Sequence, residues 1–279
     1  MGTQGSRLKK LIVTADDFGI SQEVNEAVQG AHKNGILTAT SLMVGEPFAA
    51  DAVNRARDMP DLGVGLHISL SRAHPVSPPN QIPDLVDRGG RLRSDLGGAG
   101  FRFYFLPSHR RQLAIEITAQ FEAFAETGLP LDHVNAHNHL HLHPTVLGLI
   151  LKIGKPFGMK SIRLPRDKNS KGLAAIFLTP WLALMKSRLQ KHNIRHNDVL
   201  LGLDETGALD SRTLIALIEG LSDQVAELMC HPATGPWDGM DPMAKDYRHD
   251  LELKALIDET VIDAVRDNSI ALITYRDIE

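Results

Sequence analysis

The sequence predicts an α/β fold built on a parallel β-sheet that is either closed as a barrel or open. Three observations support this prediction. Short apolar runs alternate with helical patterns along the chain, as in consecutive strand–helix units. The 279 residues, 43% of them hydrophobic and 23% charged, suffice for one large core. No internal repeat and no linker divides the sequence, so we expect a single domain over residues 1–279.

The first strand should be the apolar run Leu11–Ala15, which ends at the turn signal Asp16–Gly19. Ser21 is a suitable N-cap for a helix with apolar residues on one face, and Gly35 is a suitable residue to end it. The same alternation then predicts a strand at 38–44, a helix at 48–57 and a strand at 63–68.

Residues 70–108 are rich in proline and glycine and show no clear periodicity. A segment of this kind within a domain is usually functional, and we expect a covering loop inserted into the fold. A long helix should follow at 111–126, because Leu113, Ile117, Phe121 and Phe124 recur at helical spacing. The strand 131–136 then leads into a histidine-rich segment.

The second half continues the alternation. We expect strands at 161–164, 199–203, 225–229 and 270–274, with helices at 145–155, 211–220 and 251–267. A second insertion is expected near 165–197. It contains an apolar helix at 174–192 with Trp181 and Met185, which could pack on the core or as a lid. Alternatively, this helix could be a docking face for a lipid-like substrate, for a partner subunit in a homodimer, or for a membrane surface.

Charge and composition exclude several classes of protein. The formal charge is −4 and lysine and arginine look scattered, so no basic stripe indicates nucleic acid. The single cysteine, Cys230, cannot form an intramolecular disulfide and is expected to be an inert buried thiol. Neither a signal peptide nor a run of roughly 20 apolar residues is visible, and we expect a cytoplasmic location. Dinucleotide-binding and serine-hydrolase motifs are absent from the sequence.

The histidine-rich segment is the most informative motif. His137, His139, His141 and His143 recur at every second residue. In an extended strand these residues would share one face, so that up to four imidazoles would converge. Neutral imidazole is the commonest ligand for catalytic metals, and the segment therefore predicts a metal or active-site role.

Other polar residues follow the ends of predicted strands, where parallel barrels build their active sites. Asp16 and Asp17 indicate one metal ligand and one acid–base group, although a helix cap or turn is the simpler alternative. His67 is a plausible further ligand, since one aspartate and two histidines can hold a catalytic divalent metal. His231, between Cys230 and Pro232, is well placed as a general acid.

These motifs resemble the YdjC-like carbohydrate (chitooligosaccharide) deacetylase family over nearly the whole chain. The resemblance rests on Thr14–Gly19, Gly65–His67, His133–His141 and Cys230–Pro232, with Arg248 and the segment after it. Residues 131–137 and 141–145 are most similar to the branch associated with hopanoid biosynthesis. That branch is thought to remove an N-acetyl group from a glucosaminyl-hopanoid.

The resemblance implies a distorted TIM-like (β/α) barrel of seven or eight parallel strands with one divalent metal. Its ligands would be Asp17, His67 and His137, with Asp16 as general base and His231 as general acid. Zinc and magnesium are the main candidates, and manganese, iron or cobalt are also compatible with the ligand set. The substrate pocket is expected to contain His139, His141, Arg163 and Arg248.

One residue departs from the family pattern, because Asn135 stands where many relatives have aspartate. A carboxylate there would orient a metal-binding imidazole and raise its basicity. The resulting hypothesis is a metal-dependent hydrolase that removes an N-acetyl group from an acetylated amino sugar. A metal-dependent phosphoesterase or amidohydrolase and a non-catalytic metal- or carbohydrate-binding protein are the alternatives.

Overall fold

A computed structural model of the chain describes residues 9–167, 173–222 and 224–279. Within these residues, seven strands form one sheet in which every pairing is parallel. The strands are β1 (Lys9–Phe18), β2 (Ala39–Leu42), β3 (Gly63–Ile68), β4 (Val134–Ala136), β5 (Val199–Leu201), β6 (Val225–Cys230) and β7 (Ile270–Leu272).

The spatial order β4-β3-β2-β1-β6-β5 places the first strand in the middle of the sheet, and β7 pairs with the start of β1. Leu11, Ile12 and Val13 of β1 are 1% exposed or less, as a strand covered on both faces requires. The sheet curves into a half-barrel, which confirms the predicted single-domain α/β fold of the distorted TIM-like type.

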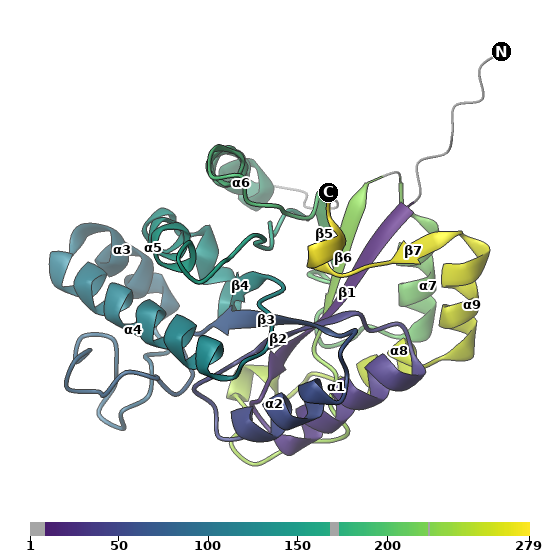
Figure 1. Cartoon of the computed structure of the whole chain (residues 1–279), viewed down its shortest axis with the longest axis horizontal. Helices are drawn as coiled ribbons and strands as arrows, with labels where there is room; N and C mark the ends of the chain where they lie inside the picture. The colour runs from purple at the N-terminus through teal and green to yellow at the C-terminus, as the bar shows by residue number, and fades with distance from the viewer. Residues whose placement is uncertain (1–8, 168–172, 223) are drawn as a thin grey trace.

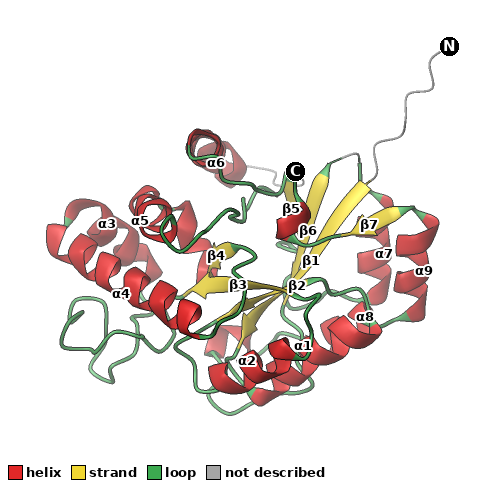
Figure 2. Cartoon of the chain, viewed as in Figure 1, coloured by secondary structure: helices red, strands yellow, loops and turns green. Residues whose placement is uncertain are grey.

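Helices surround this sheet on its outer side (Figures 1 and 2). They are α1 (Gln22–Asn34), α2 (Ala49–Arg57), α3 (Leu96–Phe105), α4 (Pro107–Glu126), α5 (Pro144–Gly154), α6 (Leu173–Lys191), α7 (Ser211–Glu219), α8 (His249–Leu256) and α9 (Glu259–Asp267), with 3-10 turns η1 (His137–Leu142), η2 (Pro242–Ala244) and η3 (Tyr275–Asp277). No helix of the described residues is long and apolar enough to cross a membrane.

Three predicted elements differ from the structure. The strand at 161–164 is wrong, because only isolated bridges join Ser161 and Ile162 to their neighbours and Pro165 lacks the N–H needed to continue a ladder. The helix at 251–267 is two helices, since α8 ends at Leu256 and Asp258 caps α9 by accepting a hydrogen bond from the Thr260 N–H.

The covering loop at 70–108 also ends differently from the prediction. Its last third forms α3, which Asp95 caps by accepting a hydrogen bond from the Gly98 N–H at 3.0 Å. Phe103 anchors this helix, because its side chain is only 3% exposed. The remaining part, up to Ser94, is irregular, as the proline and glycine content predicts. Whether 70–108 and 165–197 are insertions relative to a common fold stays a prediction.

Candidate active site

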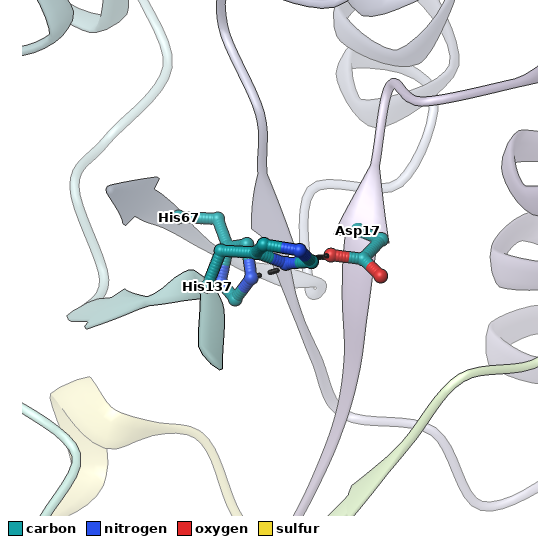
Figure 3. A group of neighbouring side chains, drawn as sticks. All are labelled: Asp17, His67 and His137. Atoms are coloured by element: carbon teal, nitrogen blue, oxygen red, sulfur yellow. Dashed lines mark hydrogen bonds and ion pairs between the residues drawn. The ribbon is translucent and has the colours of Figure 1, made fainter. Parts of the chain in front are cut away.

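Three side chains from separate strands meet at the carboxyl ends of the sheet and form a candidate cation site (Figure 3). Asp17 lies in β1, His67 in β3, and His137 directly follows β4. One potential ligand atom from each lies within 4.8 Å of the others. The Asp17 Oδ1 atom is 3.3 Å from His67 Nε2 and 3.0 Å from His137 Nδ1. One carboxylate and two imidazoles in this arrangement fit a divalent cation that keeps open coordination positions.

An irregularity in β1 brings both aspartates to this site. Adjacent residues of a regular strand point to opposite faces, but the register with β2 shifts between Ala15 and Phe18. Asp17 takes a φ of 66°, in the left-handed region that non-glycine residues rarely adopt. Burial disfavours the Asp17 carboxylate, yet the attraction and hydrogen bonding of His137 outweigh it and hold the pKa of Asp17 well below its usual range.

The Asp16 carboxylate is buried beside the cation site and accepts four hydrogen bonds. Arg163 donates two of them, from Nη1 at 2.5 Å and from Nη2 at 3.0 Å. Ser41 Oγ donates at 2.5 Å and Asn135 Nδ2 at 3.0 Å, both to Oδ1. Burial opposes ionisation, but the Arg163 charge outweighs it and holds the pKa of Asp16 well below its usual range. Asp16 is therefore fixed as an oriented carboxylate.

Arg163 is itself held between two carboxylates. Its side chain is fully buried, and Nε and Nη2 donate to Glu227 of β6 at 3.0 Å and 2.8 Å. Glu227 also accepts from Thr14 Oγ1 at 2.7 Å and from the Tyr275 hydroxyl at 2.5 Å. Our sequence reasoning missed Glu227 and Tyr275. The available signal was a single glutamate inside the apolar strand Val225–Cys230, since a buried charge needs a buried partner.

Asn135 connects the Asp16 carboxylate to the cation site. A carboxylate only accepts hydrogen bonds, so the Asn135 amide must turn Nδ2 toward Asp16 and Ser41. Its Oδ1 then lies 2.6 Å from His67 Nδ1, which must carry the hydrogen of that bond. His67 therefore presents the free lone pair of Nε2 to the Asp17 side of the site. The amide thus orients the imidazole toward the site.

His231 follows β6 and lies close enough to Asp16 to favour the Asp16 carboxylate. Its backbone is held on both sides, because its N–H donates to Glu252 Oε2 at 2.6 Å and its carbonyl oxygen lies 2.6 Å from His249 Nδ1. The His231 Nδ1 atom is buried and has no hydrogen-bond partner among the described residues. Glu252, which also binds the Gly207 N–H at 2.8 Å, was not identified from the sequence.

The four alternating histidines do not share one face, so that prediction is wrong. The segment forms η1, and Asn138 and His139 take left-handed φ values of 54° and 53°. The turn is required because α5 begins directly afterwards at Pro144, capped by His143. Only His137 of the four belongs to the cation group within the described residues.

The other expected pocket residues occupy different environments. Burial, together with the Arg163 charge, lowers the pKa of His139 to about 3 and keeps its imidazole neutral. His141 is fully buried, and its Nε2 lies 3.1 Å from the Arg163 carbonyl oxygen. Arg248 is exposed and precedes α8, with its N–H bound to the Gly207 carbonyl oxygen. Their role in a substrate pocket stays a prediction.

Burial raises the pKa of the Cys230 thiol well above its usual value, and the carboxylate of Glu252 adds to that effect. The thiol is 2% exposed, so the expectation of an inert buried cysteine agrees with its environment.

Comparison with known proteins finds one matching family and relatives that share one name, carbohydrate deacetylase. The family model described as "YdjC-like protein" matches residues 10–267. The carbohydrate deacetylase of Thermoanaerobacter pseudethanolicus is 28% identical over 268 residues, which cover 96% of this chain and 98% of that protein. The carbohydrate deacetylase of Geobacillus stearothermophilus is 30% identical over 270 residues, 95% of this chain and 96% of that protein.

A crystal structure of an Enterococcus faecalis protein, whose title refers to cellobiose-phosphate cleavage, has a similar fold. The TM-score is 0.74 and the sequence identity 25%, over 96% of this chain and 98% of that one. The lactam utilization protein of Thermus thermophilus shares the fold alone, with a TM-score of 0.51 at 13% identity over 95% of this chain and 99% of the other.

Proposed function

The chain belongs to the YdjC-like protein family, and from that premise we propose that it is a metal-dependent hydrolase that removes the N-acetyl group of an acetylated amino sugar. The observation that carries the proposal is the meeting of Asp17, His67 and His137 beside the Asp16 carboxylate. The relatives named carbohydrate deacetylases support the reaction and the class of substrate.

Asp17, His67 and His137 would hold the cation. One carboxylate and two neutral imidazoles suit zinc, manganese, iron or cobalt better than magnesium, which prefers oxygen ligands. A divalent cation bound there would polarise the amide carbonyl and lower the pKa of a bound water. Asn135 supports this role, because it fixes the tautomer in which His67 Nε2 is free to bind.

Asp16 would act as the general base. It would accept the proton of the water that attacks the amide carbon, while the new C–O bond forms. Arg163, Ser41 and Asn135 hold the carboxylate in one orientation, so little reorganisation is needed when the proton arrives. The same bonds make Asp16 a weak base in the resting protein, and proton transfer therefore depends on acidification of the water.

His231 would act as the general acid. As the C–N bond breaks, its imidazolium would donate a proton to the amine nitrogen, and acetate and the free amino sugar would leave. Two hydrogen bonds fix the position of this residue: its backbone N–H donates to Glu252, and its carbonyl oxygen lies 2.6 Å from His249 Nδ1. It follows Cys230, which pairs with Ala15, so it lies next to Asp16 at the end of the sheet. A positioned acid or base of this kind contributes about 10²–10⁴-fold to the rate.

For the substrate, we propose a lipid-linked amino sugar of the glucosaminyl-hopanoid type. The similarity of residues 131–137 and 141–145 to the hopanoid-associated branch motivates this narrower assignment. The exposed Trp181 and Leu184 of α6 offer apolar surface for a large hydrophobic aglycone, consistent with it.

Metal analysis of the purified protein followed by acetate-release assays tests the proposal. The substrates are a lipid-linked N-acetylglucosamine, a short chitooligosaccharide and a phosphorylated sugar. We expect one divalent metal per chain and faster acetate release from the lipid-linked sugar. Preference for the chitooligosaccharide would contradict the lipid assignment alone. Phosphate release without acetate release would favour a phosphoesterase and contradict the reaction.

Asp17→Asn and His67→Gln should each lose both the metal and the activity. Lys33→Glu is a matched control, because Lys33 is exposed at the end of α1 that leads into β2 and does not belong to the cation group.

A further inference from the structure

Two helices expose large apolar side chains that the core does not use. In and directly after α3, Phe101 is 63% exposed, Phe105 59%, Tyr104 47% and Leu106 38%. In α6, Trp181 is 45% exposed and Leu184 44%. A single exposed apolar residue needs no explanation, but clusters on neighbouring helices indicate a binding surface.

Both helices contact the start of α5, which follows the candidate active site in the chain. His143 Nε2 lies 3.0 Å from the Gly100 carbonyl oxygen, which joins α3 to the start of α5. Arg188 of α6 donates to the Pro144 carbonyl oxygen at 2.8 Å, and α6 also packs against η1, which begins at His137. Figure 1 shows α3, α5 and α6 on one side of the molecule, apart from α7, α8 and α9.

The same segments carry an excess of lysine and arginine, which appears when charged residues are counted segment by segment. Residues 133–197 contain 11 lysines and arginines and one acidic residue, Asp167; Arg163, one of the 11, is buried between Asp16 and Glu227 and does not contribute to the surface. Residues 96–115 contain three arginines and no acidic residue, although Asp95, directly before them, pairs with Arg102 at 3.1 Å and the whole chain has 34 acidic and 30 basic residues. Lys152 in α5 and Lys191 in α6 are exposed. The acidic residues are therefore concentrated elsewhere on the protein.

We propose that α3 and α6 form a docking surface for an anionic phospholipid bilayer. Exposed aromatic side chains would insert at the lipid interface, and the surrounding basic residues would contact the headgroups, a combination typical of interfacial helices. A second copy of this chain fits the surface less well, because like charges would face each other across a symmetric interface. Docking would hold the active site at the bilayer surface. This inference goes beyond the proposed reaction, because binding to vesicles requires no turnover.

Co-sedimentation of the purified protein with vesicles tests the proposal. One set contains phosphatidylcholine alone, and the other contains about 30% phosphatidylglycerol, which supplies the negative surface potential. We expect clear binding to the anionic vesicles, weaker binding at high salt, and little binding to the neutral vesicles.

Two variants of the surface have matched controls elsewhere. Phe101→Ser/Phe105→Ser should weaken vesicle binding at least about tenfold, whereas Ile257→Ser, which changes an exposed apolar residue at the end of α8, should not. Lys191→Glu should weaken binding about fivefold or more, whereas Lys33→Glu, with the same change of charge, should not. Thermal unfolding of each variant checks that the fold is retained.

Equal binding to neutral and anionic vesicles, no binding to either, or equal losses in the control variants would each overturn the proposal. A dimer in analytical ultracentrifugation that Phe101→Ser/Phe105→Ser dissociates, with no vesicle binding, would assign the surface to a second copy instead. Vesicle binding by a protein that releases no acetate would support the docking surface and contradict only the proposed function.

Discussion

Replacing Asp16 by Asn tests the proposed general base most directly. The substitution keeps the size of the side chain but removes the charge that faces Arg163. The amide can still accept hydrogen bonds from Ser41 and from one Arg163 nitrogen, because both now donate to the Asp16 carboxylate. The Asp17, His67 and His137 side chains are unchanged, so metal content should stay close to that of the wild-type protein.

The stability cost follows from the burial of Arg163. Removing one partner of a buried ion pair typically costs about 3–5 kcal/mol, because a charge remains without compensation. Arg163 is fully buried but keeps Glu227 at 2.8 Å, so we expect the lower end, about 3 kcal/mol. Activity should fall by about 10²–10⁴-fold, as expected for loss of a positioned base. Urea unfolding measures the first effect, and acetate release at saturating metal measures the second.

Glu227→Gln is the matched control. It removes the other carboxylate of the same buried arginine, on a side chain that is also fully buried. We expect a similar loss of stability, but a kcat within about tenfold of wild type because Asp16 is still present. If Glu227→Gln lost as much activity as Asp16→Asn, or if Asp16→Asn stayed active, the assignment of Asp16 as general base would be refuted.

Four further outcomes are expected. Asn135→Asp should retain metal, because the new carboxylate still accepts a hydrogen bond from His67. Its kcat should fall at least about tenfold, because the new carboxylate and that of Asp16 would lie about 3 Å apart and repel each other. Metal analysis and steady-state kinetics separate the two effects. His231→Gln should lower kcat about 100-fold without changing metal content, measured in the same assays. Chelation should abolish acetate release and lower the thermal unfolding temperature, and both should return when the metal is restored. Burial disfavours the Asp132 carboxylate, but the hydrogen bond and charge of His133, with Arg276, outweigh it and lower the pKa of Asp132. The ionised Asp132 carboxylate should stabilise the fold fully above the ordinary pKa of aspartate. This stabilisation should be lost as the pH falls toward the lower pKa that Asp132 has in the folded protein. The difference in unfolding free energy between wild type and Asp132→Asn should therefore be constant near neutral pH and shrink below about pH 4 in urea titrations.

Much of the fold could be predicted because local patterns and burial agree. The continuous apolar run after Lys10 can only be a strand covered on both faces, and Ser21 caps α1 through the Val24 N–H as expected. Predictions failed where tertiary contacts override the local pattern. Residues 161–164 have the composition of a strand, yet they serve mainly to carry Arg163 into the centre of the barrel.

The candidate site was only partly predictable for the same reason. Strand ends grouped Asp16, Asp17, His67, His137 and His231 at one edge of the sheet, and the family resemblance selected Asp17, His67 and His137 among them as ligands. The network behind them could not be predicted, since Ser41, Glu227 and Tyr275 have no sequence spacing that relates them to Asp16. The alternation of histidines also misled the analysis, because periodicity says nothing of the left-handed residues Asn138 and His139 that turn the chain.

Hydrogen bonds link the Asp16 carboxylate, the proposed general base, to a residue that is synthesised more than 250 positions later. The Tyr275 hydroxyl binds Glu227, Glu227 holds Arg163, and Arg163 holds Asp16. Asp132 also accepts hydrogen bonds from the backbone N–H groups of Tyr275 and Arg276. A nascent chain on the ribosome therefore cannot complete this hydrogen-bond network until Tyr275 has been added and has left the exit tunnel.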